Sequence, residues 1–137
     1  MGLKSKTLLI YLFLLISITA KSQDVKYLDS LAKNCQACLD KGVAMLYCEN
    51  IYYESVDVAL NKVYQRIFGK LDSPNKIQFR NEQRIWLHKR DEYFSEVDKE
   101  FPSDGNYIDE DTRMMRLDKK ATFVDARIRE LLKREGR

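Results

Sequence analysis

Apolar residues recur at helical spacing along most of the chain. The clearest stripes advance in steps of three, four or seven residues, as one face of an α-helix requires. The first contains Tyr53, Leu60, Tyr64, Ile67 and Leu71; the second Phe79, Gln83, Trp86, Arg90, Tyr93 and Val97; the third Met114, Leu117, Ala121, Val124, Ile128 and Leu131. These stripes predict helices over about 45–71, 74–100 and 111–133, preceded by a short amphipathic segment around residues 25–32.

Helix-breaking residues fall between the predicted helices. Asp72-Ser73-Pro74 predicts a tight break, with Ser73 as the N-cap and Pro74 at the first helical position. Pro102 and Gly105 predict a loop before the last helix. We therefore expect an all-α domain: a long antiparallel helix hairpin plus a short N-terminal and a C-terminal helix.

The short break also predicts which residues of the hairpin face each other. Facing positions should have numbers that sum to about 147, which places Leu60 opposite Trp86, Tyr64 opposite Gln83, and Asp57 opposite Arg90. Opposite charges at one level of a core-facing stripe predict an ion pair between Asp57 and Arg90. The alternative, that Asp57 is a buried general acid or base, is disfavoured because no second carboxylate or histidine is placed beside it.

The first 22 residues have the pattern of a secretory signal peptide. Lys4 and Lys6 precede an apolar run over residues 8–18, and Ala20 and Ser22 offer a small-x-small cleavage site. The run is shorter than the roughly 20 residues that span a bilayer. We expect residues 23–137 to form a single secreted or periplasmic domain without a stable membrane anchor after cleavage.

Removing this segment changes the charge balance. It takes away Lys4, Lys6 and Lys21, so the 24 Lys plus Arg of the chain fall to 21 against 21 Asp plus Glu. A neutral domain gives no support to nucleic-acid binding, which needs a basic face.

No catalytic or cofactor motif is recognisable. The sole histidine, His88, lies two residues from Trp86 and should point away from the core. Cys35-x-x-Cys38 could suggest a thioredoxin-like redox pair, but no strand pattern surrounds it, and four zinc ligands are not available nearby. In an oxidising compartment the three cysteines predict one disulfide and one leftover thiol. We predict a non-enzymatic protein without a cofactor.

A two-part motif resembles the signature of the LprI-like lysozyme-inhibitor family. Its residues are Tyr53, Asp57, Leu60, Asn61 and Tyr64, followed by Gln83, Trp86, Arg90 and Asp91. Arg127 and Leu131 match the family's terminal Arg-x-x-x-Leu element, so the resemblance covers about residues 35–132. Members are small exported helical proteins, and at least one branch inhibits lysozyme, which implies binding rather than catalysis.

The resemblance also bears on the cysteines. The family spacing favours a Cys35–Cys48 disulfide, with Cys38 free. Two further family cysteines are replaced here by Phe94 and Lys119, which implies that a second bridge is missing.

The function expected from these observations is binding of a lysozyme or another envelope protein. The alternatives are a structural or stress-related envelope protein with no lysozyme target, and a thiol oxidoreductase using Cys35 and Cys38. Residues 98–111 hold six acids and one base, and this local charge of −5 would steer a basic partner. The candidate partner-binding residues are Asp98, Glu100, Phe101, Asp104, Tyr107, Asp109 and Glu110. Acids before a helix are also common helix-start residues, and that explanation stays open.

Overall fold

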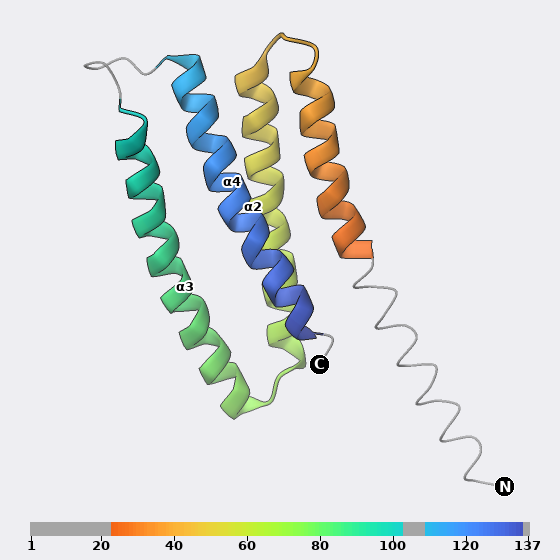
Figure 1. Ribbon diagram of the computed structural model, residues 1–137. Helices are drawn as coiled ribbons and strands as arrows, with labels where there is room; N and C mark the ends of the chain where they lie inside the picture. Colours follow the sequence, from red (N-terminus) through yellow and green to blue (C-terminus); the bar gives the residue numbers. More distant parts are fainter. Residues whose placement is uncertain (1–22, 103–108, 136–137) are drawn as a thin grey trace, which may run out of the picture.

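The computed structural model describes residues 23–102 and 109–135, which fold into helices joined by short connections (Figure 1). The first helix covers residues 23–39, and is followed by α2 (Met45–Lys70), α3 (Ser73–Glu100) and α4 (Glu110–Glu135). No strand occurs in these residues. The all-α prediction is confirmed, while the first helix is longer than the short amphipathic segment expected. The predicted signal peptide lies outside the described residues.

Two turns set the path of the chain. Between the first helix and α2, Gly42 adopts a left-handed conformation with φ of 67°, which glycine tolerates without strain. At the start of α3, the backbone N–H of Asn75 donates to Asp72 Oδ1 at 3.0 Å. Asp72 is therefore the N-cap, and the prediction that Ser73 caps this helix is wrong by one residue; Pro74 lies in the first turn as expected.

The core lies where α4 packs against the other helices. Its contacts are most extensive with α2 and fewer with α3. The α4 residues Ala121, Val124, Ile128 and Leu131 are fully buried, as their stripe predicted. The other buried core residues include Leu28, Val56, Leu60, Val63, Phe79 and Trp86. Burial of such side chains contributes roughly 1.5 to 3 kcal/mol each.

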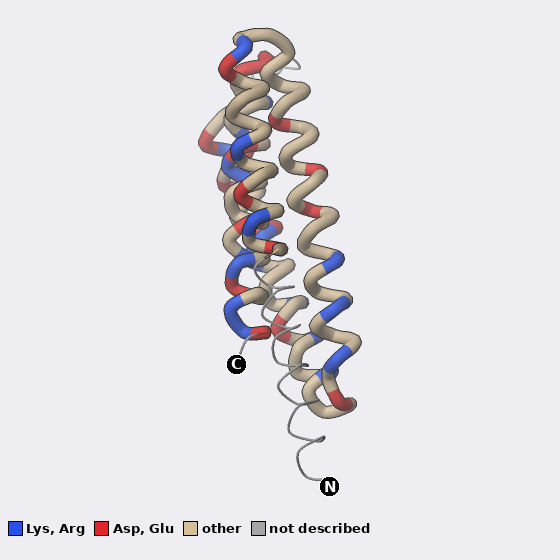
Figure 2. The backbone as a smooth tube through the Cα atoms, turned by 90° about the vertical axis from the view of Figure 1, so that its right-hand side faces the viewer, with Lys and Arg blue, Asp and Glu red and all other residues tan. Residues whose placement is uncertain are grey.

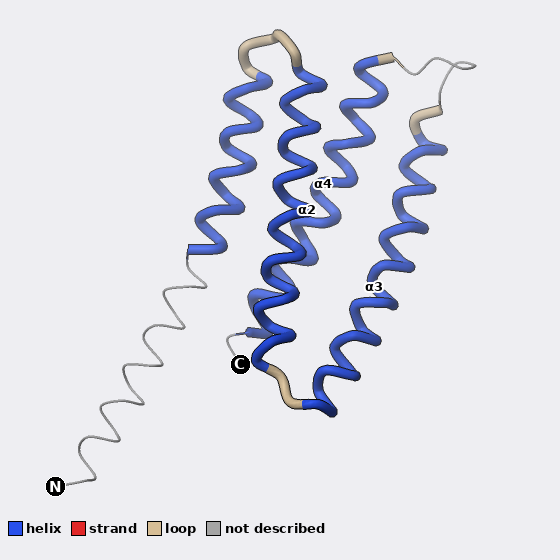
Figure 3. The backbone as a smooth tube through the Cα atoms, turned by 180° about the vertical axis from the view of Figure 1, so that it is seen from behind, coloured by secondary structure: helices blue, strands red, loops and turns tan. Residues whose placement is uncertain are grey.

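Helices α2 and α3 run in opposite directions and diverge from their short connection. Figure 3 views the molecule from the side where α4 lies behind α2; in this projection α4 begins between α2 and α3 and crosses behind α2 toward its C-terminal end. The fourth helix therefore contacts both helices, and α2 more extensively than α3.

Ion pairs join the C-terminal end of α2 to the C-terminal end of α4. Figure 2 shows that α2 is acidic in its first half and basic in its second half. In the basic half, Arg66 and Lys70 both pair with Glu135 of α4, at 2.8 and 2.7 Å. These contacts hold the pKa of the Glu135 carboxyl below its ordinary value despite partial burial. The pairs fix the end of α4 against α2.

None of the helices in residues 23–102 and 109–135 has the length and apolar character needed to cross a bilayer.

Candidate functional site

The candidate partner-binding segment lies at the end of the bundle where α3 finishes and α4 begins. Asp104 and Tyr107 fall outside the described residues. Among the others, Asp98 pairs with Lys120 at 2.7 Å and lies 3.6 Å from Arg116. Glu100 pairs with Lys119 at 2.7 Å. These cations come from α4, so two of the predicted acids serve to join α3 to α4.

Phe101 is also held by α4. The guanidinium of Arg116 donates through Nε to the Phe101 carbonyl oxygen at 2.9 Å. The ammonium of Lys119 lies 5.1 Å from the centroid of the Phe101 ring, within the range of a cation–π contact. The half-buried ring is therefore fixed against α4, and little of it is free to anchor a partner.

Asp109 caps α4. Its Oδ1 accepts a hydrogen bond from the backbone N–H of Thr112 at 2.8 Å, which lowers the pKa of the Asp109 carboxyl. Glu110 and Asp111 occupy the first turn, where acids interact favourably with the helix dipole. Both are exposed, and neither they nor Asp109 form an ion pair among the described residues. The helix-start explanation thus accounts for part of the acidic cluster, while its charge stays exposed to solvent.

The two-part motif converges on a groove between α2 and α3. The motif residues Asp57, Leu60, Asn61 and Tyr64 line the α2 wall, together with Gln65. The motif residues Gln83 and Arg90 line the α3 wall, together with Arg80, Arg84 and Leu87. The groove has a volume of about 310 Å³. No residue of α4 lines it, so it opens on the side away from that helix. Two of the predicted facing pairs, Asp57 with Arg90 and Tyr64 with Gln83, line the groove together, whereas Trp86, predicted to face Leu60, does not line it.

The aromatic residues of the motif pack against other aromatic rings. Trp86 is buried, and its ring stacks on Phe123 of α4 with centroids 5.9 Å apart. Tyr53 is half-buried, with its ring 6.3 Å from that of Phe94. Tyr64 stacks on Phe79 with centroids 5.0 Å apart. His88 is exposed, as expected.

The predicted ion pair between Asp57 and Arg90 is wrong. Arg90 pairs with Asp91, the adjacent residue of its own helix, at 2.7 Å. Its guanidinium lies over the rings of Trp86 and Phe94, at 5.9 and 5.6 Å from their centroids. Asp57 and Arg90 both line the groove between α2 and α3, but they do not come within ion-pair distance of each other.

The buried cation is instead Arg127 of α4, whose structural role the sequence analysis missed. Arg127 is 6% exposed and donates through Nε and Nη2 to Gln83 Oε1, at 3.3 and 3.1 Å. It also pairs with Glu130 at 2.8 Å and lies over the Trp86 ring at 5.7 Å from the centroid. Its place on the inner face of α4, three residues after Val124, was the available signal.

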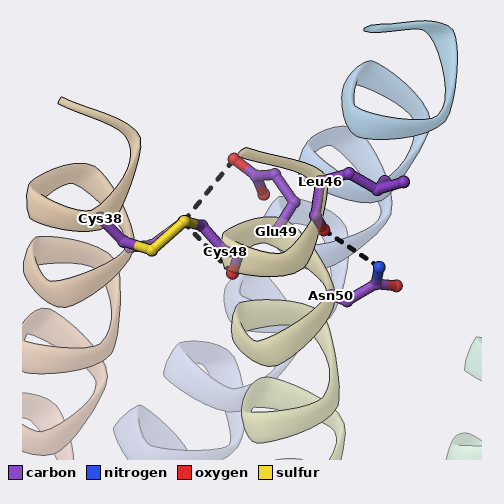
Figure 4. Close-up of a disulfide and its surroundings, with 6 residues drawn as sticks. Cys38, Leu46, Cys48, Glu49 and Asn50 are labelled. Carbon is purple, nitrogen blue, oxygen red and sulfur yellow. Dashed lines mark hydrogen bonds between the residues drawn. A yellow bond between two sulfur atoms is a disulfide. The ribbon is translucent and has the colours of Figure 1, made fainter. Parts of the chain in front are cut away.

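The cysteine pairing also differs from the prediction. The disulfide joins Cys38 to Cys48 (Figure 4), with Cα atoms 5.8 Å apart. Cys35 is the free, buried thiol. The prediction of a Cys35–Cys48 bridge is therefore wrong. The first helix and α2 run antiparallel from the turn at residues 40–44, so the cysteine nearer the turn lies level with Cys48. Cys35 lies one helical turn further from it.

A buried carboxyl accompanies the free thiol. Cys35 Sγ donates to Glu49 Oε1 at 3.6 Å, and Glu49 is 4% exposed, with Oε2 unpaired among the described residues. Burial raises the pKa of Cys35 to about 12, with a further contribution from the charge of Glu49. Burial and the charge of Asp118 raise the pKa of Glu49. A thiol with a raised pKa is a poor nucleophile, so this arrangement does not favour redox chemistry through Cys35.

In the described part of the chain, no group of three or more His, Cys, Asp or Glu side chains is placed to bind a metal ion. The described residues define a small, disulfide-bonded, all-α protein whose polar residues join its helices or line an open groove.

Comparison with known families identifies the class further. The chain matches the family model described as lysozyme inhibitor LprI over residues 33–131, and it belongs to that family. No match was found among curated proteins. None was found among solved structures.

Proposed function

We propose that this protein is an exported binding protein of the cell envelope whose target is a lysozyme. The observation that carries the proposal is membership of the LprI lysozyme-inhibitor family over most of the chain. The signal-peptide pattern of residues 1–22 and the Cys38–Cys48 disulfide support an oxidising compartment.

We place the recognition surface at the acidic end of the bundle, around the start of α4. Asp98 and Glu100 are neutralised by lysines of α4, so they contribute little to the field. The described acids left to steer a basic partner are Asp109, Glu110 and Asp111, and the sequence places Asp104 in the same segment, outside the described residues. Many lysozymes are strongly basic, so this end is complementary to them in charge.

The experiment measures inhibition and binding separately. Purified mature protein is added to a turbidity assay of cell-wall lysis by a basic lysozyme, and association is followed by biolayer interferometry at several salt concentrations. We expect slower lysis and an association rate that falls with salt. Unaltered lysis and no binding at any salt concentration would overturn the proposal and favour a structural envelope protein.

A triple variant locates the surface. Asp104→Asn, Asp109→Asn and Glu110→Gln remove three charges while Asn keeps the cap of α4. We expect slower association and a flatter salt dependence, with a nearly constant melting temperature. The matched control is Glu54→Gln, Glu92→Gln and Glu96→Gln, three exposed acids on other helices. Equal losses in both triple variants would mean that net charge, not this surface, drives the binding.

A further inference from the structure

The groove between α2 and α3 carries an excess of positive charge. Its lining contains Arg80, Arg84 and Arg90 and a single acid, Asp57. Arg90 is paired with Asp91, whereas Arg80 and Arg84 form no ion pair with any residue in 23–102 or 109–135. Both are exposed. The guanidinium of Arg80 also lies over the Phe68 ring, 5.3 Å from its centroid, a contact that uses the flat face of the group and leaves its N–H donors for an anion.

The charge is unevenly distributed along the groove. The antiparallel levels place Asp57 beside Arg90 at one end, and Tyr64 and Gln65 beside Arg80 and Arg84 at the other. Asp57 and Asp91 balance the first end, so the uncompensated charge lies at the second. A ligand would therefore direct its carboxylates toward Arg80 and Arg84.

Uncharged polar side chains line the groove as well. Gln83 Oε1 is occupied by Arg127, which fixes the amide and leaves Nε2 as its unused donor among the described residues. Asn61 donates to the Asp57 carbonyl, which leaves Asn61 Oδ1 as an acceptor. Side chains that both donate and accept suit the peptide groups of a polypeptide better than they suit a compact anion.

The length and apolar residues of the groove fit the same ligand. Ten residues separate Arg80 from Arg90, which corresponds to about 15 Å along α3. An extended peptide spans this distance with about five residues. Leu60, Tyr64 and Leu87 provide apolar contact area between the charged ends.

We propose that the groove between α2 and α3 binds a short acidic peptide segment in extended form, with its carboxylates at Arg80 and Arg84. The positive charge of this site is opposite to that of the acidic end of the bundle. The site is therefore independent of the proposed lysozyme contact, and the two are tested separately.

The test titrates ¹⁵N-labelled mature protein with the pentapeptide Ala-Ala-Gly-Glu-Glu and with its neutral counterpart Ala-Ala-Gly-Gln-Gln amide, followed by NMR and calorimetry. We expect shifts of backbone amides within residues 57–65 and 80–90, and at least tenfold weaker binding of the neutral peptide. The double variant Arg80→Gln/Arg84→Gln should weaken the acidic peptide about tenfold, with an unchanged melting temperature. Asp57→Asn should retain binding.

The matched control removes two positive charges outside the groove, by Lys89→Gln on α3 and Arg113→Gln on α4, both exposed. It should bind the acidic peptide as the wild type does. Three results would each overturn the proposal. The neutral peptide could bind equally well, the control could weaken binding as much as the groove variant, or inorganic phosphate could bind as tightly as the peptide. If the groove amides shift with protein concentration in the absence of peptide, the groove binds a second copy of the chain instead of an acidic peptide.

Discussion

Replacing Arg127 should be among the most destabilising single changes in the domain. Its side chain is 5% exposed, and its two hydrogen bonds to Gln83 join α4 to α3. Hydrogen bonds that involve a charged group contribute about 1.5 to 3 kcal/mol, and the contact over Trp86 adds about 1 kcal/mol. The pair with Glu130 adds little, because that partner is 56% exposed. We therefore expect Arg127→Ala to lower the free energy of unfolding by about 3 kcal/mol.

The measurement is urea unfolding of the mature protein, followed by circular dichroism at the helical band. With a denaturant dependence of about 1.5 kcal/mol per molar urea, the midpoint should fall by about 2 M. The comparison is Arg90→Ala, which removes a surface ion pair with the 65% exposed Asp91 and two cation–π contacts. We expect that change to cost about 1 kcal/mol.

Two apolar variants test whether the loss comes from leaving the partner of Arg127 without a hydrogen bond or from lost packing. Arg127→Met alone leaves Gln83 Oε1 without its partner, whereas Arg127→Met combined with Gln83→Leu removes both partners and should recover much of the loss. If Arg90→Ala destabilises the domain as much as Arg127→Ala, then the core cation has been assigned to the wrong residue.

Four further predictions concern Cys35, Glu49 and Trp86. Cys35 should resist iodoacetamide at pH 8 in the folded protein and react after unfolding, and peptide mapping should find Cys38 joined to Cys48; modification of native Cys35 would contradict its burial. Because folding raises the pKa of Cys35 from 9.0 to about 12, the unfolded thiol ionises first, and stability should fall as the pH rises above 9. Folding also raises the pKa of Glu49. The wild type therefore loses stability as the pH rises above 4.5, the pKa in the unfolded chain, because Glu49 ionises more readily there than in the folded protein. The variant Glu49→Gln cannot ionise at this position, so the difference in stability between the variant and the wild type should shift in favour of the variant from pH 4 to pH 7. If the free energy of unfolding changes with pH in the same way for both proteins, this prediction is refuted. Trp86→Ala should cost at least 3 kcal/mol in the same urea assay, and a loss below about 1 kcal/mol would contradict its place in the core.

The helices could be predicted from the sequence because their signals are local. The spacing of apolar residues predicted α2 and α4 to within a few residues, and Asp72-Ser73-Pro74 predicted the start of α3. The buried face of α4 was also predicted, since Ala121, Val124, Ile128 and Leu131 occupy one stripe. Such patterns depend on the 3.6-residue period alone.

The side-chain partners depended on how the helices are arranged in three dimensions. The facing levels of α2 and α3 follow from the length of their connection, but whether residues at one level touch depends on the distance between the helices. Packing of α4 against both separates them, so Asp57 and Arg90 border a groove and Arg127 of α4 enters the core. The spacing of residues along α2 and α3 does not reveal how α4 packs against them.

The cysteines and the acidic segment show the same division. The sequence predicted one disulfide and one free thiol, but Cys35 and Cys38 are a single turn apart, and only the register of the first helix against α2 selects Cys38 as the partner of Cys48. The sequence also showed the cluster of acids at residues 98–111. Only the packed structure revealed that Asp98 and Glu100 are paired with lysines of α4, because those lysines lie about 20 residues away in the chain and are brought close by folding.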